Sequence, residues 1–330
     1  MKNLNSEIQI LKQFQNKHID LVEIEVLGSI GPDNLPVHGI SIGSNDPTHP
    51  TLGLFGGVHG LEKIGSQLLL SFIEVMDSRL DWDDDFKEQL KTTRIVCIPM
   101  INPWGLINFS RCNINGVDLM RNAPVDAEEK ATFLVGGHRI SNKLPWFRGK
   151  LDEPMEVESS ILMDFVQKNM FQSKVSVALD FHSGFGLKDQ IWYPYAKSKK
   201  PFPFLNQFLN LAKVFEDTYS HHVYKIEPQS LTYTTHGDLW DYAIELHSNS
   251  ENSHNTFIPI TLELGSWAWI KKNPIQIFSL FGLFNPIKKH RYNRIMRRHI
   301  YLIDFLFKAI RNDKSWNKMA HPEGFEPPTF

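Results

Sequence analysis

Cysteine is almost absent from this chain of 330 residues, which has only Cys97 and Cys112. Two thiols cannot build a disulfide framework or a cysteine-rich zinc module. Such low cysteine usage is typical of a protein that folds in a reducing compartment. We therefore expect a fold that is held by its own hydrophobic core, and a cytoplasmic location.

Long apolar stretches are also missing. No window of 18 apolar residues occurs, and the opening MKNLNSE lacks the apolar core of a signal peptide. The longest apolar region, residues 274–284, is interrupted by Gln276 and Ser279. The sequence predicts no membrane-spanning helix, and it leaves open a weak contact of this region with a membrane surface.

Neither sign of charge is in excess, because 35 Lys and Arg face 37 Asp and Glu. A net charge of −2 does not fit a protein dominated by nucleic-acid binding, so no nucleic-acid partner is expected. Six basic residues are nevertheless concentrated between Lys288 and Arg298, within an amphipathic pattern that continues to residue 310. The simpler interpretation is a solvated helix face, and the alternative is contact with an anionic surface.

What the chain does contain is an alternation of strand and helix patterns. Strand patterns cover residues 21–27, 37–42, 51–58, 94–101, 175–181, 191–195 and 257–264. Helical spacing of apolar residues covers residues 61–76, 157–170, 205–215 and 292–310. The alternation predicts an α/β layer fold with a largely buried mixed sheet. No linker divides the chain, so we expect one domain over residues 1–320 and a disordered, proline-rich tail over residues 321–330.

A candidate metal site follows the apolar strand at residues 51–58. His59 and Glu62 come directly after the Gly56-Gly57 turn, and a spacing of three places both on one turn or helical face. Imidazole nitrogen and carboxylate oxygen are both good zinc ligands. The pair alone is a weak signal, but ligands of open α/β sheets collect at the carboxyl ends of strands.

His182 ends a second apolar strand and would complete a His/Glu/His set. Three protein ligands leave the fourth zinc position open, which is the catalytic arrangement. Asp180 shares the face of His182 on a regular strand and is expected to orient a ligand from behind. Taken alone, His182 is more simply a hydrogen-bonded residue at the end of a strand.

Three further residues carry possible chemistry. Glu263 lies in the apolar stretch PITLELG, where a carboxylate is costly unless it is paired or functional. It is a candidate general base, and a salt-bridged residue of an edge strand is the alternative. Arg111 and Arg121 flank residues 115–119 and could bind a substrate carboxylate or a developing oxyanion. For either arginine taken alone, an ordinary surface salt bridge is the favoured interpretation.

Five short motifs together resemble a known family. In chain order they are HGLE at 59–62, NPWG at 102–105, GVDLMRN at 116–122, DFHSG at 180–184 and TLEL at 261–264. This order is similar to that of the zinc carboxypeptidases, and the resemblance covers about residues 50–270. It implies a carboxypeptidase-like fold with a mixed, mostly parallel twisted sheet of about eight strands, and one zinc ion per chain.

The resemblance also implies roles for individual residues. The implied zinc ligands are His59, Glu62 and His182, and the implied general acid/base is Glu263. Arg111 resembles the arginine that polarises the scissile carbonyl, and Arg121 with Asn122 resembles the binder of the terminal carboxylate. Tyr242 resembles the mobile tyrosine that closes over substrate, with Trp240 or Tyr233 as alternatives. One departure is Met120, where the family usually has Asn, because a thioether is a poor hydrogen-bond partner for a carboxylate.

The function expected from these residues is zinc-dependent hydrolysis of an amide bond, by a metallocarboxypeptidase acting on peptides. One alternative is an N-acyl amino acid deacylase similar to succinylglutamate desuccinylase and aspartoacylase. Another is a metal- or peptide-binding module without turnover, but Glu263 argues against it because binding alone does not need a base. The side-chain preference of the substrate and the oligomeric state stay open.

Overall fold

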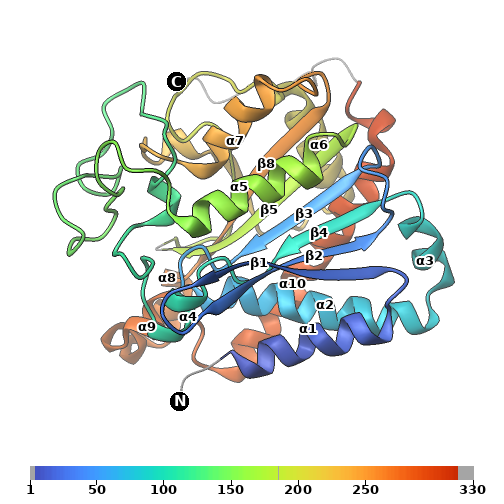
Figure 1. The fold of residues 1–330 in the computed structure, drawn as a ribbon, viewed down its shortest axis with the longest axis horizontal. Helices are drawn as coiled ribbons and strands as arrows, with labels where there is room; N and C mark the ends of the chain where they lie inside the picture. Colours follow the sequence, from blue (N-terminus) through green and yellow to red (C-terminus); the bar gives the residue numbers. More distant parts are fainter. Residues whose placement is uncertain (1–3, 185, 319–330) are drawn as a thin grey trace.

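The computed structural model describes residues 4–184 and 186–318. A twisted eight-stranded sheet crosses the molecule in the order β1-β2-β4-β3-β5-β8-β6-β7 (Figure 1). The strands are β1 Val22–Ile30, β2 Leu35–Gly43, β3 Thr51–Gly56, β4 Arg94–Ile98, β5 Val175–Gly184, β6 Gln190–Tyr193, β7 Lys225–Pro228 and β8 Thr256–Gly265. The central strands β4, β3, β5 and β8 are parallel, as are β6 and β7, and the other neighbours are antiparallel. This confirms the predicted mixed, mostly parallel sheet.

Helices cover both faces of the sheet. The helices α1, α2 and α10 lie below it in Figure 1, and α5 and α7 lie above it. The α-helices are α1 Asn5–Lys17, α2 Lys63–Trp82, α3 Asp84–Leu90, α4 Pro103–Asn108, α5 Val157–Met170, α6 Leu205–Thr218, α7 Leu239–Ser248, α8 Trp267–Lys272, α9 Leu280–Phe284 and α10 Lys289–Arg311. Short 3₁₀ turns are η1 Leu119–Arg121, η2 Gln229–Leu231, η3 Pro274–Phe278 and η4 Asp313–Ser315.

The central strands are apolar because both of their faces are covered. Every residue of β3 and β4 is buried, and so is all of β5 except its last residue, Gly184. A strand enclosed between two helix layers must be apolar on both sides, which explains the unbroken apolar runs of the sequence. Gly53 shows how closely α5 approaches, because a Cβ at Gly53 would lie 2.6 Å from Met170 Sδ.

The parallel strands place the site. The carboxyl ends of β3, β5 and β8 reach the same edge of the sheet, and the β5/β8 register sets His182 opposite Glu263. Gly57, which follows β3, has a φ of +73°, and a Cβ there would lie 2.5 Å from Ser66 Oγ. This tight turn carries the chain from β3 past His59 into α2.

Several details differ from the sequence-based expectations. The helix expected from residue 61 begins at Lys63, so His59 and Glu62 lie in the turn before it rather than on a helical face. Helix α1 and strand β7 were not predicted. Among the described residues, no helix is both long and apolar enough to cross a membrane. The tail expected at residues 321–330 lies outside the described residues.

Candidate metal centre

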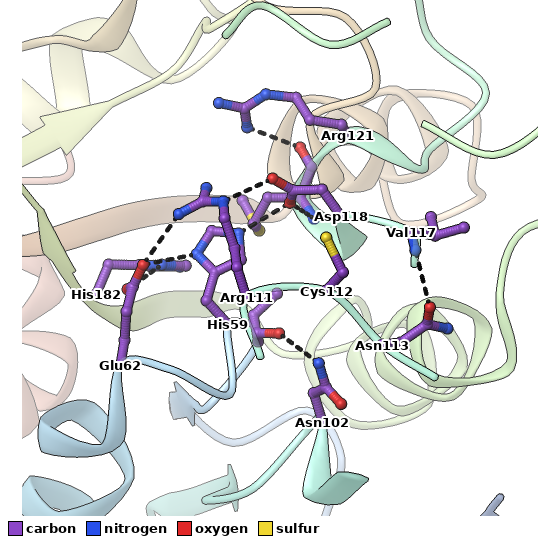
Figure 2. Close-up of polar contacts among 12 residues, drawn as sticks. His59, Glu62, Asn102, Arg111, Cys112, Asn113, Val117, Asp118, Arg121 and His182 are labelled. Atoms are coloured by element: carbon purple, nitrogen blue, oxygen red, sulfur yellow. Dashed lines mark hydrogen bonds and ion pairs between the residues drawn. The ribbon is translucent and has the colours of Figure 1, made fainter. Parts of the chain in front are cut away.

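Two histidines and one glutamate converge at the carboxyl edge of the sheet (Figure 2). His59 follows β3, Glu62 precedes α2, and His182 lies near the end of β5. His59 Nδ1 lies 3.0 Å from Glu62 Oε1, and His182 Nδ1 lies 3.2 Å from Glu62 Oε2. All three side chains are buried, and one ligand atom from each lies within 4.8 Å of the others. The set proposed from the sequence thus comes together in the fold.

The spacing and the chemistry of these atoms fit a zinc ion. Ligand atoms placed tetrahedrally at the usual zinc distances lie about 3.3 Å from one another. The two Nδ1-to-carboxylate distances, 3.0 and 3.2 Å, are close to that value. Two imidazole nitrogens and a carboxylate form the three-ligand set of catalytic zinc sites, which keep a fourth position for water or substrate.

Each histidine is held from behind by a buried aspartate. His59 Nε2 lies 2.9 Å from Asp118 Oδ1, and His182 Nε2 lies 2.8 Å from Asp180 Oδ2. An imidazole that donates its Nε2–H to a carboxylate presents the lone pair of Nδ1, and here both Nδ1 atoms face Glu62. The sequence predicted the position of Asp180, but it assigned no role to Asp118.

Both aspartates have further partners that fix them. Asp118 Oδ2 accepts a hydrogen bond of 2.9 Å from Arg111 Nε, and Oδ1 accepts one of 3.1 Å from the Met120 backbone N–H. Burial raises the pKa of Asp118, but Arg111 and His59 outweigh it and hold that pKa well below its usual value. Asp180 Oδ2 also accepts a hydrogen bond of 2.9 Å from Trp240 Nε1.

Charges of both signs balance inside this buried cluster. Burial raises the pKa of Glu62, yet His59 and His182 hold it below its ordinary value, so the carboxylate stays ionised. Burial lowers the pKa of His182, whereas Asp180 and Glu62 raise it well above its ordinary value. Arg111 Nη1 lies 3.2 Å from Glu62 Oε1 and adds a second positive charge.

Glu263 lies beside this cluster, opposite His182. Its Oε2 is buried and accepts no hydrogen bond among the described residues. Burial raises the pKa of Glu263 to about 8, which suits a group that takes and returns a proton near neutral pH. Glycine at position 184 leaves room for this carboxyl, because a Cβ there would lie 2.9 Å from Glu263 Oε2. The alternative of an edge-strand residue is wrong, since β8 lies between β5 and β6.

Arg121 lies above the cluster in Figure 2. Its buried side chain donates from Nε to Val135 O at 3.1 Å and from Nη1 to Met120 O at 3.0 Å. Its guanidinium carbon lies 5.9 Å from the centre of the Tyr233 ring. Gly237 approaches the backbone of Arg121 so closely that any Cβ would collide with its carbonyl, and its φ is +68°.

The structure brings Tyr233, rather than Tyr242, to this place. Tyr242 lies in α7 and packs against the hydrophobic core. Burial raises the pKa of Tyr233. Glu263 acts in the same direction, whereas Arg121 and Arg111 act to lower this pKa. The sequence had offered Tyr233 as an alternative, but spacing to the HGDLW stretch could not decide between the two.

Asn122 and Met120, the two residues next to Arg121 in the chain, make contacts within the protein itself. Asn122 donates to Arg148 O at 3.0 Å and accepts from the Glu156 N–H at 2.7 Å, so its amide braces the surrounding loops. Its contact with substrate stays a prediction. Met120 is buried in the hydrophobic core cluster, and its polar contacts are made by its backbone.

A narrow cavity lies behind the centre and was not foreseen from the sequence. Its lining includes Trp192, Asp238, Trp240 and Thr261. Asp238 Oδ1 caps α7 by accepting from the Trp240 and Asp241 N–H groups. Asp238 Oδ2 and Trp192 Nε1 are buried with no partner among the described residues. Burial raises the pKa of Asp238 above its usual value.

Comparisons with known proteins agree with this geometry. The model of the zinc carboxypeptidase family matches residues 7–275. Carboxypeptidase D of Mus musculus is 31% identical over 126 residues, which are 34% of this chain and 9% of that protein. Carboxypeptidase E of Caenorhabditis elegans is 31% identical over 128 residues, 34% of this chain and 27% of the other. The carboxypeptidase N catalytic chain of Rattus norvegicus is 25% identical over 198 residues, 54% and 42% of the two chains.

This chain therefore spans less than half of the length of these relatives.

Solved structures show the same fold at low sequence identity. Bovine thrombin-activatable fibrinolysis inhibitor superposes with a TM-score of 0.68 at 18% identity, over 94% of this chain and 97% of the other. Carboxypeptidase A from Helicoverpa armigera gives 0.67 at 16% identity, over 96% and 74%. Because the family model covers most of the residues that build the sheet and the centre, this chain belongs to the zinc carboxypeptidase family.

Proposed function

We propose that this protein is a zinc-dependent metallocarboxypeptidase that removes C-terminal residues from peptides. The observation that carries the proposal is the position of Glu263. Its Oε2 is buried and has no hydrogen-bond partner among the described residues, and the residue lies opposite His182, one of three residues that can hold a metal ion. A module that only binds metal or peptide would not need this group.

One zinc ion per chain would be held by His59 Nδ1, Glu62 and His182 Nδ1. Bound there, zinc supplies a Lewis acid that lowers the pKa of water toward about 7. Asp118 and Asp180 fix the two imidazole rings through Nε2. Such supporting contacts commonly change metal affinity or activity about 10–100-fold.

The protein's own residues then perform the proton transfers. Glu263 accepts a proton from the attacking water and passes it to the leaving amine, and the vacant Oε2 is the atom that can do this. Arg111 is oriented through Nε by Asp118 and through Nη1 by Glu62, so Nη2 is the nitrogen that would bind the oxyanion forming on the scissile carbonyl.

The terminal carboxylate of the substrate would bind at Arg121. Backbone carbonyls occupy the N–H of Nε and one N–H of Nη1, so the carboxylate would bind through the remaining N–H groups of Nη1 and Nη2. Tyr233, whose ring lies next to this guanidinium, is the tyrosine we assign to close over the substrate. Met120 offers no amide, so the carboxylate is held more weakly than where an Asn assists.

The test combines one substitution with a substrate panel. Glu263→Gln keeps the shape of the side chain and removes the base, so zinc content should stay while kcat falls about 10²–10⁴-fold. Wild-type protein should hydrolyse peptides with a free C-terminal carboxylate and spare the same peptides with an amidated end. Near-normal turnover of Glu263→Gln would refute the role of this residue. Hydrolysis of N-acyl amino acids in place of peptides would show a deacylase instead.

A cytoplasmic location is the remaining part of the proposal. Cys97 is buried and Cys112 is half-buried, and both are free thiols. Burial raises the pKa of Cys112 to about 12, so this thiol is unreactive at neutral pH. A pair of unlinked cysteines supports a reducing environment. Fractionation of cells that express the chain would test it.

A further inference from the structure

The segment that follows Glu263 differs in charge from the rest of the chain. Residues 264–303 contain eight Lys and Arg residues and no Asp or Glu. The whole chain has 35 basic and 37 acidic residues, so the remainder has 27 against 37 and is acidic. The near-neutral total conceals a strongly basic region of one molecule.

The same segment exposes large apolar side chains. The structure describes 17 exposed large hydrophobic residues, and five of them lie between positions 275 and 287. They are Ile275, Ile277, Phe278, Leu280 and Ile287, and Phe278 is the most exposed of all at 90%. Single exposed apolar residues are normal, but such a concentration marks an interaction site.

These side chains form one protruding unit. Helices α8 and α9 and the turn η3 pack on one another at one end of the molecule, beside α4 (Figure 1). Gln276 Nε2 donates to the carbonyls of Gly282 and Asn285, and Arg291 Nη1 donates to Trp269 O at 2.8 Å. We call the exposed apolar residues just named, with Lys271, Lys272, Lys288 and Lys289, the apolar-basic surface.

The four lysines of this surface are exposed and have no acidic partner within 4 Å among the described residues. Exposed lysines elsewhere are often paired, as Lys213 is with Asp217. We propose that the apolar-basic surface docks on an anionic lipid bilayer, with the apolar side chains entering the headgroup boundary and the lysines binding acidic headgroups. The two features together favour a bilayer, because lipid accepts protruding apolar side chains without shape complementarity.

The docking surface is tied directly to the metal centre. Asn285 donates to Leu61 O at 2.8 Å and accepts from the Ile64 N–H at 2.9 Å, on either side of Glu62. Ser183 Oγ, next to His182, donates to Phe284 O at 2.7 Å. A bilayer held here would therefore lie beside the reaction centre. This inference does not depend on the proposed peptidase activity, because it uses none of the metal ligands.

The experiment is flotation of the full chain with lipid vesicles. The protein should float with vesicles of phosphatidylcholine mixed with phosphatidylglycerol, and not with phosphatidylcholine alone, and salt should weaken the association. Phe278→Ser with Ile275→Ser should abolish flotation. Lys288→Gln with Lys289→Gln should lower partitioning about 25-fold, at about 5-fold per lysine.

Matched controls carry the same changes elsewhere. Phe133→Ser removes a single apolar side chain that is 79% exposed and lies outside the apolar-basic surface, and Lys143→Gln with Lys199→Gln removes two exposed charges. Both should float like the wild type, and peptide hydrolysis without vesicles, with folding checked by circular dichroism, should be unchanged in every variant. The proposal falls if wild-type protein does not bind the anionic vesicles, if controls and surface variants lose binding alike, or if phosphatidylcholine alone binds equally. It also falls if Phe278→Ser with Ile275→Ser still floats, or if those changes dissolve a dimer instead.

Discussion

Two parts of this molecule contain a high density of charge and handle it in opposite ways. In the metal centre, Asp118, Asp180 and Glu62 are buried and each meets a positive partner within 3.2 Å. In the apolar-basic surface, Lys288 and Lys289 are exposed and unpaired among the described residues. The net charge of the whole chain, −2, gives no sign of either region.

The difference teaches where charge must be compensated. A buried ion costs several kcal/mol unless it is paired, so each group in the centre is fixed by its partners. An exposed lysine stays hydrated and costs little, so it remains available for an external partner. A substitution in the centre should therefore have a large effect through its neighbours, and one on the surface should affect only what binds there.

The largest effect should follow His182→Ala. It removes a ligand and also leaves Asp180 buried without its imidazole partner, so zinc content and activity should both be lost. Metal analysis of the purified protein measures this directly. His49→Ala, at a half-buried histidine bonded to Ser44, should keep a full complement of zinc. Unchanged zinc in His182→Ala would show that the ion binds elsewhere.

Asp118→Asn should have the next largest effect. The amide keeps the shape but holds His59 less well, and zinc affinity should fall about 10–100-fold. Competition with a metal chelator gives the affinity. The control is Asp126→Asn, since Asp126 is an exposed residue paired with Arg148. If zinc affinity survives Asp118→Asn, this aspartate serves only to hold Arg111.

A third case is a buried ionisable group without a hydrogen-bond partner in the part of the chain that the structure describes. His247 packs against Phe171 and Phe257, neither ring nitrogen is hydrogen-bonded to a described residue, and burial lowers the pKa of His247 to about 4. Because the folded-state pKa lies below the ordinary 6.5, the neutral ring supports the fold above pH 6.5 and this stability is lost as pH falls through about 4. Denaturant unfolding measures this effect. As pH falls from 7 to 4, the unfolding free energy of His247→Phe should increase relative to that of the wild type by about 2 kcal/mol. An equal pH response of both proteins would exclude His247 as the cause.

The smallest effect on the protein itself should come from Lys288→Gln with Lys289→Gln. The unfolding free energy should change by less than about 0.5 kcal/mol, because these side chains lie in water. Zinc content should also be the same as in wild type. Denaturant unfolding measures the first and metal analysis the second. A loss comparable to that of a buried pair would mean that these lysines stabilise the fold.

The sequence predicted what is local and apolar, and it missed what depends on a loop folding back. His59, Glu62 and His182 were predicted because each follows a recognisable strand end. Asp118 lies 59 residues from His59, and no pattern shows that the loop between α4 and η1 brings this carboxylate to the His59 ring. The choice between Tyr242 and Tyr233 could not be made from the sequence, because the loop before α7 turns at Gly237, whose positive φ was not foreseen. The four-residue strand β7 is too short for periodicity to detect.

The contacts behind His182 have one more consequence. Asp180 and Glu62 raise the pKa of His182 well above its ordinary value, so they favour the protonated ring, in which Nδ1 carries a proton that faces Glu62. Zinc can occupy Nδ1 only after this proton has left. Metal uptake is therefore a proton-releasing reaction, its heat depends on the ionisation enthalpy of the buffer, and its apparent affinity declines as the solution becomes more acidic.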